Sequence, residues 1–189
     1  MTSGVNVLGM RDREILLDAS TIIGVDEVGR GALAGPVVVC AAAFEEIPDD
    51  GDVQDSKLLS PGRRNSAAAR LCCSARWVVC EVWPELIDRI NILEATRLAM
   101  AAAARTLIVP RSVVVTDFVD PGKLPCRVLS PKRADRDYFC VAAASIFAKV
   151  HRDRIMVDLA RKDPRWGWDR NKGYGTVDHR RALENVGPG

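Results

Sequence analysis

Near the N-terminus, an apolar run ends in two adjacent carboxylates and then enters a glycine-rich turn. Residues 21–26 are mostly apolar and β-branched, which predicts a strand, and Asp26 and Glu27 lie at its end. The valine-rich residues 36–44 predict a second strand after the turn, so a hairpin is expected. Adjacent carboxylates beside exposed backbone N–H groups suit a divalent metal and a phosphate, which makes this corner the expected site of chemistry.

The spacing of Gly29, Gly31 and Gly35 superficially matches a dinucleotide-binding loop. That loop requires a helix directly after the glycines, because the pyrophosphate lies at the helix N-terminus. β-branched residues follow Gly35 instead. The sequence therefore argues against a dinucleotide-binding fold.

The rest of the chain alternates helical and extended patterns, with no internal repeat. Ser60 and Pro61 provide an N-cap and a first-turn proline for a helix, and apolar spacing predicts two further, longer helices. Two more segments have the composition of strands. Helices are expected at about 61–73, 84–106 and 137–162, and strands at 76–82 and 112–116.

Length and composition predict an ordinary globular protein. The chain has 189 residues, of which 48% are hydrophobic, and one domain is expected. The longest apolar run, residues 37–44, is far shorter than the ~20 residues of a membrane helix, and the charged first 18 residues do not fit a secretory signal. We therefore expect a cytoplasmic protein. The six cysteines lack zinc-ligand spacing and are expected to be reduced.

Two further acids lie where functional groups often occur. Asp117 ends the strand predicted at 112–116, although an aspartate there could equally cap a turn. Asp135 and Asp137 lie where the last long helix begins, and one of them is expected to be its N-cap.

If these acids meet the Asp26-Glu27 pair in space, their mutual repulsion requires cations. Oxygen ligands without cysteine or paired histidine indicate Mg²⁺ or Mn²⁺. Two such ions would activate a water and stabilise the leaving oxygen of a phosphodiester. The acids therefore suggest hydrolysis of nucleic acid.

The C-terminal third is basic: residues 121–189 contain 15 Lys or Arg against 8 Asp or Glu. Such a surface attracts phosphates, although a solvated basic helix has the same composition. Ser145, Lys149 and Arg152 share one helical face and could contact a phosphate chain. Tyr174, between two glycines, could stack on a sugar or base, or simply pack in a turn.

Several segments, taken in chain order and spread over nearly the whole chain, form a recognisable set. They are GVDEVGRG at 24–31 with AGP at 34–36, DSKL at 55–58, NIL at 91–93 with Ala95 and AM at 99–100, Asp117, AAASIFAKV at 142–150 with RD at 152–153, and GYGT at 173–176 with His179. This set resembles the corresponding segments of the type-2 ribonucleases H, the ribonuclease HII family.

The resemblance implies a ribonuclease H-like α/β fold, with a mixed central sheet and helices on both faces. Residues 1–189 would form one catalytic domain that lacks much of the C-terminal extension of many relatives. Four carboxylates would bind two Mg²⁺ or Mn²⁺ ions: Asp26, Glu27, Asp117 and, counting back from residues 143–145, Asp135.

The implied substrates are RNA-DNA hybrids and DNA that contains single ribonucleotides. The cut would fall 5′ of the ribonucleotide and leave a 3′-hydroxyl and a 5′-phosphate, and the enzyme would act as a monomer. Backbone groups of Gly29, Arg30 and Gly31 would recognise the 2′-hydroxyl, which distinguishes RNA from DNA, and Tyr174 would stack on the neighbouring sugar. The implied candidates for phosphate or backbone contacts are Lys57, Ser145, Lys149 and Arg152.

Departures from the family pattern keep two alternatives open. Relatives often have a glycine before the fourth acid, where Ala134 stands here, so Asp137 is an alternative to Asp135. Phe118 replaces a usual glycine after the third acid, and Asp120 is a possible substitute ligand.

Two other functions compete with the nuclease hypothesis. One is a non-catalytic nucleic-acid-binding module with structural acids, in which Asp26→Asn would leave function intact. The other is a metal-independent hydrolase that uses a Ser145/Lys149 dyad and resists chelators. His151 and His179 are interpreted as an exposed helical histidine and a turn histidine, the latter a possible contact of phosphate or of the tyrosine loop.

Overall fold

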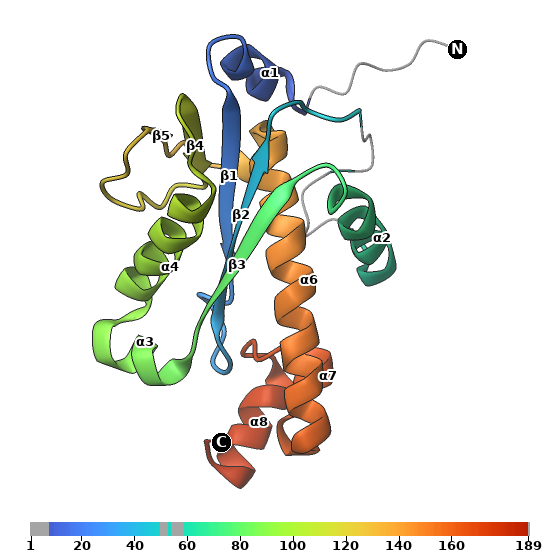
Figure 1. Cartoon of the computed structure of the whole chain (residues 1–189). Coiled ribbons are helices and arrows are strands. Elements are labelled where there is room, and N and C mark those ends of the chain that lie inside the picture. Colours follow the sequence, from blue (N-terminus) through green and yellow to red (C-terminus); the bar gives the residue numbers. More distant parts are fainter. Residues whose placement is uncertain (1–7, 50–52, 54–58, 189) are drawn as a thin grey trace.

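The structure is a computed structural model that describes residues 8–49, 53 and 59–188 (Figure 1). Its centre is a five-stranded sheet with the strand order β3-β2-β1-β4-β5. The strands are β1 (Thr21–Val28), β2 (Val37–Phe44), β3 (Arg76–Val82), β4 (Ser112–Thr116) and β5 (Arg127–Leu129). β2 is antiparallel to β1 and β3, whereas β4 is parallel to β1 and β5. The sheet is therefore mixed, the predicted hairpin is confirmed, and only β5 was not predicted.

Helices cover both faces of the sheet, which confirms the α/β class (Figure 1). The long helix α6 (Phe139–Lys162) and α2 (Pro61–Leu71) lie on one face, and α4 (Ile92–Leu107), preceded by α3 (Pro84–Ile90), lies on the other. The shorter elements are α1 (Met10–Leu16), α5 (Ala134–Asp137), a 3-10 turn (Pro164–Trp166), α7 (Trp168–Asn171) and α8 (Val177–Val186). No helix among the described residues is long and apolar enough to span a bilayer.

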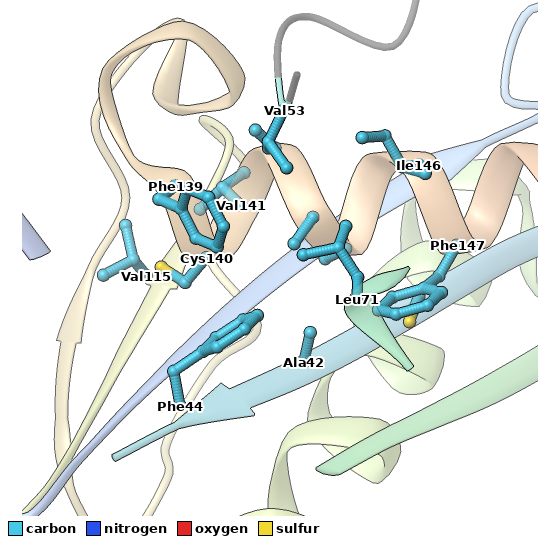
Figure 2. Packing of buried hydrophobic residues seen from close by; sticks show 14 of the residues in the cluster. Ala42, Phe44, Val53, Leu71, Val115, Phe139, Cys140, Val141, Ile146 and Phe147 are labelled. Atoms are coloured by element: carbon cyan, nitrogen blue, oxygen red, sulfur yellow. The ribbon is translucent and has the colours of Figure 1, made fainter. Parts of the chain in front are cut away.

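Each face of the sheet has its own apolar core. In β1, Ile22 belongs to the core under α6 and Ile23 to the core under α4. Figure 2 shows the α6 side, where Phe139 meets Phe44 of β2 edge to face with ring centroids 5.5 Å apart. Because both faces are covered, β2 is buried along its whole length, which explains its uninterrupted run of small apolar residues.

β1 and α6 are in closest contact at Gly24. A Cβ at this position would overlap the backbone carbonyl of Cys140 in α6, so the contact requires glycine. We expect Gly24→Ala to destabilise the protein by about 3 kcal/mol, because the strand or the helix must shift within a close-packed core. Thermal unfolding measures this loss. The control is Gly62→Ala in α2, where a Cβ meets no atom within 4 Å, and equal losses in the two variants would contradict the prediction.

The single helix predicted at 84–106 is wrong, because the chain breaks at Asn91 into α3 and α4. Asn91 has a φ of 68°, which ends α3. Its side-chain oxygen accepts hydrogen bonds from the N–H groups of Leu93 and Glu94 at 3.0 and 3.1 Å. Asn91 is therefore the N-cap of α4.

The start of α6 also differs from the prediction, since neither Asp135 nor Asp137 caps it. Both acids lie in the separate short helix α5. The buried Asp12 of α1 instead accepts hydrogen bonds from the N–H groups of Phe139 and Cys140, each at 2.9 Å. A carboxylate here satisfies unpaired N–H groups and complements the helix dipole. This capping residue is 127 positions away from Phe139 in the sequence, beyond the reach of any local pattern.

Candidate active site

Six residues predicted for the site line one cavity of about 380 Å³. They are Asp26, Glu27, Asp117, Ser145, Lys149 and Tyr174, and Val28 and Arg64 complete the lining. The carboxylates, a hydroxyl, an ammonium group and an aromatic ring therefore converge from distant parts of the chain. A larger cavity of about 810 Å³ lies at the start of β1 and β4 and contains none of the predicted site residues.

The strand register explains why the acids meet. β1 and β4 run parallel with Val25 opposite Thr116, so the next residues, Asp26 and Asp117, leave the same edge of the sheet. The close contact of α6 with β1 brings Ser145 within hydrogen-bonding distance of Asp26. Pairing of two strands and packing of one helix thus assemble the centre of the site.

The acid pair is electrostatically unfavourable as it stands. Burial raises the pKa of Asp26 well above 3.8, and the neighbouring charge of Glu27 adds to this, while the Ser145 hydrogen bond opposes it. Burial also raises the pKa of Glu27, against the opposing effect of Arg30, whose guanidinium donates to Oε1 at 3.1 Å. Glu27 Oε2 is buried without a hydrogen-bond partner. Such a pair calls for a cation.

A hydrogen bond connects Asp117 to the short helix that carries Asp135 and Asp137. Asp117 accepts a hydrogen bond from the N–H of Ala134 at 2.9 Å, and Ala134 directly precedes Asp135. Asp135 is buried, with 4% of its surface exposed, but it is not among the residues that line the cavity. Asp137 faces outward and pairs with Arg11 at 2.9 Å. Of the two alternatives for the fourth acid, Asp135 directly follows the residue that donates to Asp117, whereas Asp137 pairs with Arg11 of α1.

Asp120, the possible substitute for Asp117 as a metal ligand, stabilises a turn instead. Its carboxylate accepts a hydrogen bond from the N–H of Gly122 at 2.8 Å and closes a turn. Phe118, in the position where relatives often have glycine, adopts a positive φ of 61° and is exposed. The chain therefore keeps the glycine-like conformation there without glycine.

The glycine-rich turn at residues 29–36 lies against the loop that carries Tyr174. The N–H of Leu33 donates to the Gly173 carbonyl at 2.8 Å, and Ala32 forms an isolated bridge with Tyr174. The Tyr174 ring lies 5.6 Å from Lys149 Nζ, a cation–π distance. The turn that contains residues 29–31 thus contacts the loop of Tyr174, but residues 29–31 are not among the residues that line the cavity.

Sequence reasoning missed Arg64. Its guanidinium donates to the Leu59 carbonyl at 2.7 Å and lies 3.6 Å from Asp153, which also pairs with Lys149 at 2.7 Å. Arg64 comes from the first turns of α2, and no local pattern distinguishes it from Arg63. Knowing which side of α2 packs on α6 would have identified it.

Arg152 differs from its prediction as a phosphate contact. Its side chain is fully buried, and its guanidinium donates to three backbone carbonyls, so it does not face the cavity. Arg152 lies two helical turns after Ser145, where α6 packs against the turn at residues 29–36 and the loop that begins at Lys172. Lys57, the remaining predicted contact, lies outside the described residues.

The two histidines and the cysteines take no direct part in the cavity. His151 is half-exposed and pairs with Glu81 at 2.6 Å. His179 is fully buried in α8 rather than in a turn; Trp168 donates to its Nε2 at 3.1 Å, and its Nδ1 lies 3.0 Å from the Tyr174 carbonyl. The contact with the tyrosine loop is thus present. All six cysteines are free in the structure; Cys40 and Cys140 are buried, and Cys72 and Cys73 are exposed.

Comparisons of sequence and of structure with known proteins both find type-2 ribonucleases H. The ribonuclease HII family model matches residues 23–188. Ribonuclease HII of Cereibacter sphaeroides is 46% identical over 169 residues, which cover 88% of this chain and 79% of that protein. The Thermus thermophilus enzyme is 44% identical over 168 residues, covering 88% and 81%. The crystal structure of ribonuclease H2 from Pyrococcus horikoshii has a TM-score of 0.74 and 29% identity, covering 87% of this chain and 86% of that one.

The mixed sheet and its acidic edge therefore belong to the ribonuclease H fold. Within that class, the chain belongs to the ribonuclease HII family. It is a ribonuclease H, a hydrolase that acts on RNA-DNA substrates.

The glycine-rich turn allows a test of its geometry. Gly29 has a φ of 105°, and a Cβ there would lie 2.5 Å from Arg152 Nε and 2.7 Å from the Pro36 carbonyl oxygen. We expect Gly29→Ala to lower kcat/KM on an RNA-DNA hybrid by about 100-fold, because Gly29 lies two residues after Glu27 and strain at Gly29 displaces that acid itself. Gly122→Ala carries similar backbone strain at a φ of 82° without any contact within 4 Å. The prediction is wrong if both variants cleave equally well.

Proposed function

We propose that this ribonuclease H cuts on the 5′ side of ribonucleotides, both in RNA-DNA hybrids and where single ribonucleotides are embedded in DNA, leaving 3′-hydroxyl and 5′-phosphate ends. The cut would depend on two Mg²⁺ or Mn²⁺ ions held by Asp26, Glu27, Asp117 and Asp135. One observation carries the proposal: Asp26, Glu27 and Asp117 meet in one cavity with Lys149 and Tyr174.

The donor chemistry of the site fits hard divalent ions. The carboxylates provide oxygen ligands, and the unpartnered Glu27 Oε2 is a buried acceptor for a cation. Within the part of the chain that the structure describes, no three acid, imidazole or thiol groups already lie close enough to hold an ion. Ligation would therefore require rotation of the carboxylates. Bound divalent ions would supply an activated water and stabilise the leaving oxygen.

The other residues would bind and orient the substrate. Ser145 orients the Asp26 carboxylate through its hydrogen bond. Lys149, between Asp153 and Tyr174, would place its ammonium group near a phosphate. Backbone groups of residues 29–31 would form hydrogen bonds with the 2′-hydroxyl, and Tyr174 would stack on the adjacent sugar. The cleaved strand would thus be selected by its ribose rather than by its bases.

The test is incision of a labelled DNA duplex that contains one ribonucleotide, with an all-DNA duplex as control. We expect Mg²⁺- or Mn²⁺-dependent cutting on the 5′ side of the ribonucleotide, no cutting of the all-DNA duplex, and no activity in EDTA. A 5′-phosphate on the downstream fragment is expected from its ligation behaviour. Binding without cutting would favour a binding module, and cutting that persists in EDTA would favour the Ser145/Lys149 dyad.

A further inference from the structure

The guanidinium of Arg152 lies between the turn at residues 29–36 and the loop at residues 172–176. Its Nε donates to the Pro36 carbonyl at 2.9 Å and its Nη2 to the Ala34 carbonyl at 3.0 Å. Its Nη1 donates to the Lys172 carbonyl at 2.8 Å. The Arg152 side chain of α6 therefore holds both loops, and its Cζ lies 5.3 Å from the centroid of the Tyr174 ring.

The two loops fit together without spare room. The N–H groups of Leu33 and Ala34 both donate to the Gly173 carbonyl, at 2.8 and 3.3 Å. A Cβ at Gly173 would overlap the Ala34 carbonyl oxygen, and one at Gly35 would overlap the sulfur of Met156. The spacing between the loops is therefore defined by close contacts as well as by Arg152.

Arginine suits this task better than lysine. Its planar fork has five donors in fixed directions, so that one group can satisfy several carbonyls at once. A buried charge is costly unless it is well hydrogen-bonded, and here each guanidinium nitrogen has a carbonyl partner. A lysine ammonium has a single nitrogen and cannot span three carbonyls at these positions.

We propose that Arg152 is a positioning residue that holds residues 29–31 at a fixed distance from Tyr174, and thereby sets the preference for a single embedded ribonucleotide over a continuous hybrid. This inference rests on the proposed function. A lone ribonucleotide has one 2′-hydroxyl, so the turn and the tyrosine must engage the same junction together. A hybrid has a 2′-hydroxyl on every nucleotide, so loops with altered spacing still find a productive register.

The test compares Arg152→Lys with the unmodified enzyme on both substrates. We expect kcat/KM to fall at least 10-fold for the single ribonucleotide and less than 3-fold for the hybrid. The control is Arg161→Gln, which removes one charge from the same helix at an exposed ion pair with Asp158 and should change neither value by more than 2-fold. Equal losses on the two substrates, or no loss on either, would overturn the proposal.

Amide hydrogen exchange provides a readout independent of activity. In Arg152→Lys, the Leu33 and Ala34 amides should exchange at least 10-fold faster, whereas amides in the β1–β2 ladder should be unchanged. Unchanged exchange at Leu33 and Ala34 would refute the proposal even if activity fell. If the unmodified enzyme cuts neither substrate, the proposed function fails, and the exchange result still decides whether Arg152 joins the loops.

A second variant covers the case in which Arg152→Lys does not fold. Gly173→Ala forces the Ala34 carbonyl away from the tyrosine loop while Arg152 is retained. It should produce the same shift in preference between the two substrates. If it lowers both activities equally, spacing of the loops does not set the preference and the proposal is wrong.

Discussion

Replacing Asp26 with asparagine is expected to lower the rate of incision at least ~1,000-fold and, at the same time, to stabilise the metal-free protein. The loss of activity follows because an amide is a poor ligand for a hard divalent ion, and a thousandfold corresponds to about 4 kcal/mol of transition-state stabilisation. The gain in stability follows because the buried Asp26 carboxylate repels Glu27 and Asp117. Asparagine keeps the size of the side chain and its capacity to bond Ser145.

The pH dependence of stability separates these two effects. Burial raises the pKa of Asp26 in the folded state above its ordinary value of 3.8, so the folded protein holds this proton more tightly than the unfolded chain. Stability in EDTA should therefore fall as the pH rises from about 4 through the raised pKa. The Asp26→Asn variant should lose this part of the slope.

Thermal unfolding in EDTA between pH 4 and pH 8 measures the effect. Near neutral pH the variant should unfold at a higher temperature, by about 2–4 °C for each kcal/mol gained in a protein of this length. A variant that is less stable than the unmodified protein near pH 7, or one that still cuts the substrate, would show that Asp26 is a structural acid.

Replacing Asp117 with asparagine is expected to abolish incision to a similar extent, with little change in stability. The amide oxygen can still accept the hydrogen bond from the Ala134 N–H, so α5 and Asp135 stay in place. What disappears is the third negative charge at the edge of the sheet. Initial rates with saturating Mg²⁺ or Mn²⁺ measure the loss.

Asp120→Asn is a matched control three residues further along. Its side-chain oxygen closes a turn with Gly122, and asparagine can make the same hydrogen bond. We expect its rate to lie within about 3-fold of the unmodified enzyme, as for a surface change away from the site. If Asp120→Asn were the inactive variant and Asp117→Asn the active one, the assignment of the third acid would be reversed.

The sequence was most informative where local patterns dominate. The strand that leads to Asp26, the hairpin and the Val-rich strand before Asp117 all follow from apolar, β-branched runs and turn residues. Each is confirmed, although β1 continues to Val28. The break at Asn91 was missed because apolar spacing continues through it, whereas its cap depends on one side-chain oxygen.

The features that the sequence did not predict depend on contacts between residues far apart in the chain. The parallel pairing of β1 with β4, which brings Asp117 beside Asp26, links segments about 90 residues apart and has no local signature. Helical spacing correctly grouped Ser145 with Lys149 but could not reveal that Arg152 lies beneath two loops. Arg64 and Asp12 were missed for the same reason, since their roles depend on which helices pack together.

Crystals soaked in Mn²⁺ would test the metal site most directly, through anomalous scattering measured at the manganese edge. We expect anomalous peaks for manganese in the cavity, at bonding distance from carboxylate oxygens of Asp26 and Asp117. The carboxylates of Glu27 and Asp135 should complete the ligand set. Peaks confined to other acids, or a cavity without manganese at concentrations that support cleavage, would contradict a metal-dependent nuclease built on these residues.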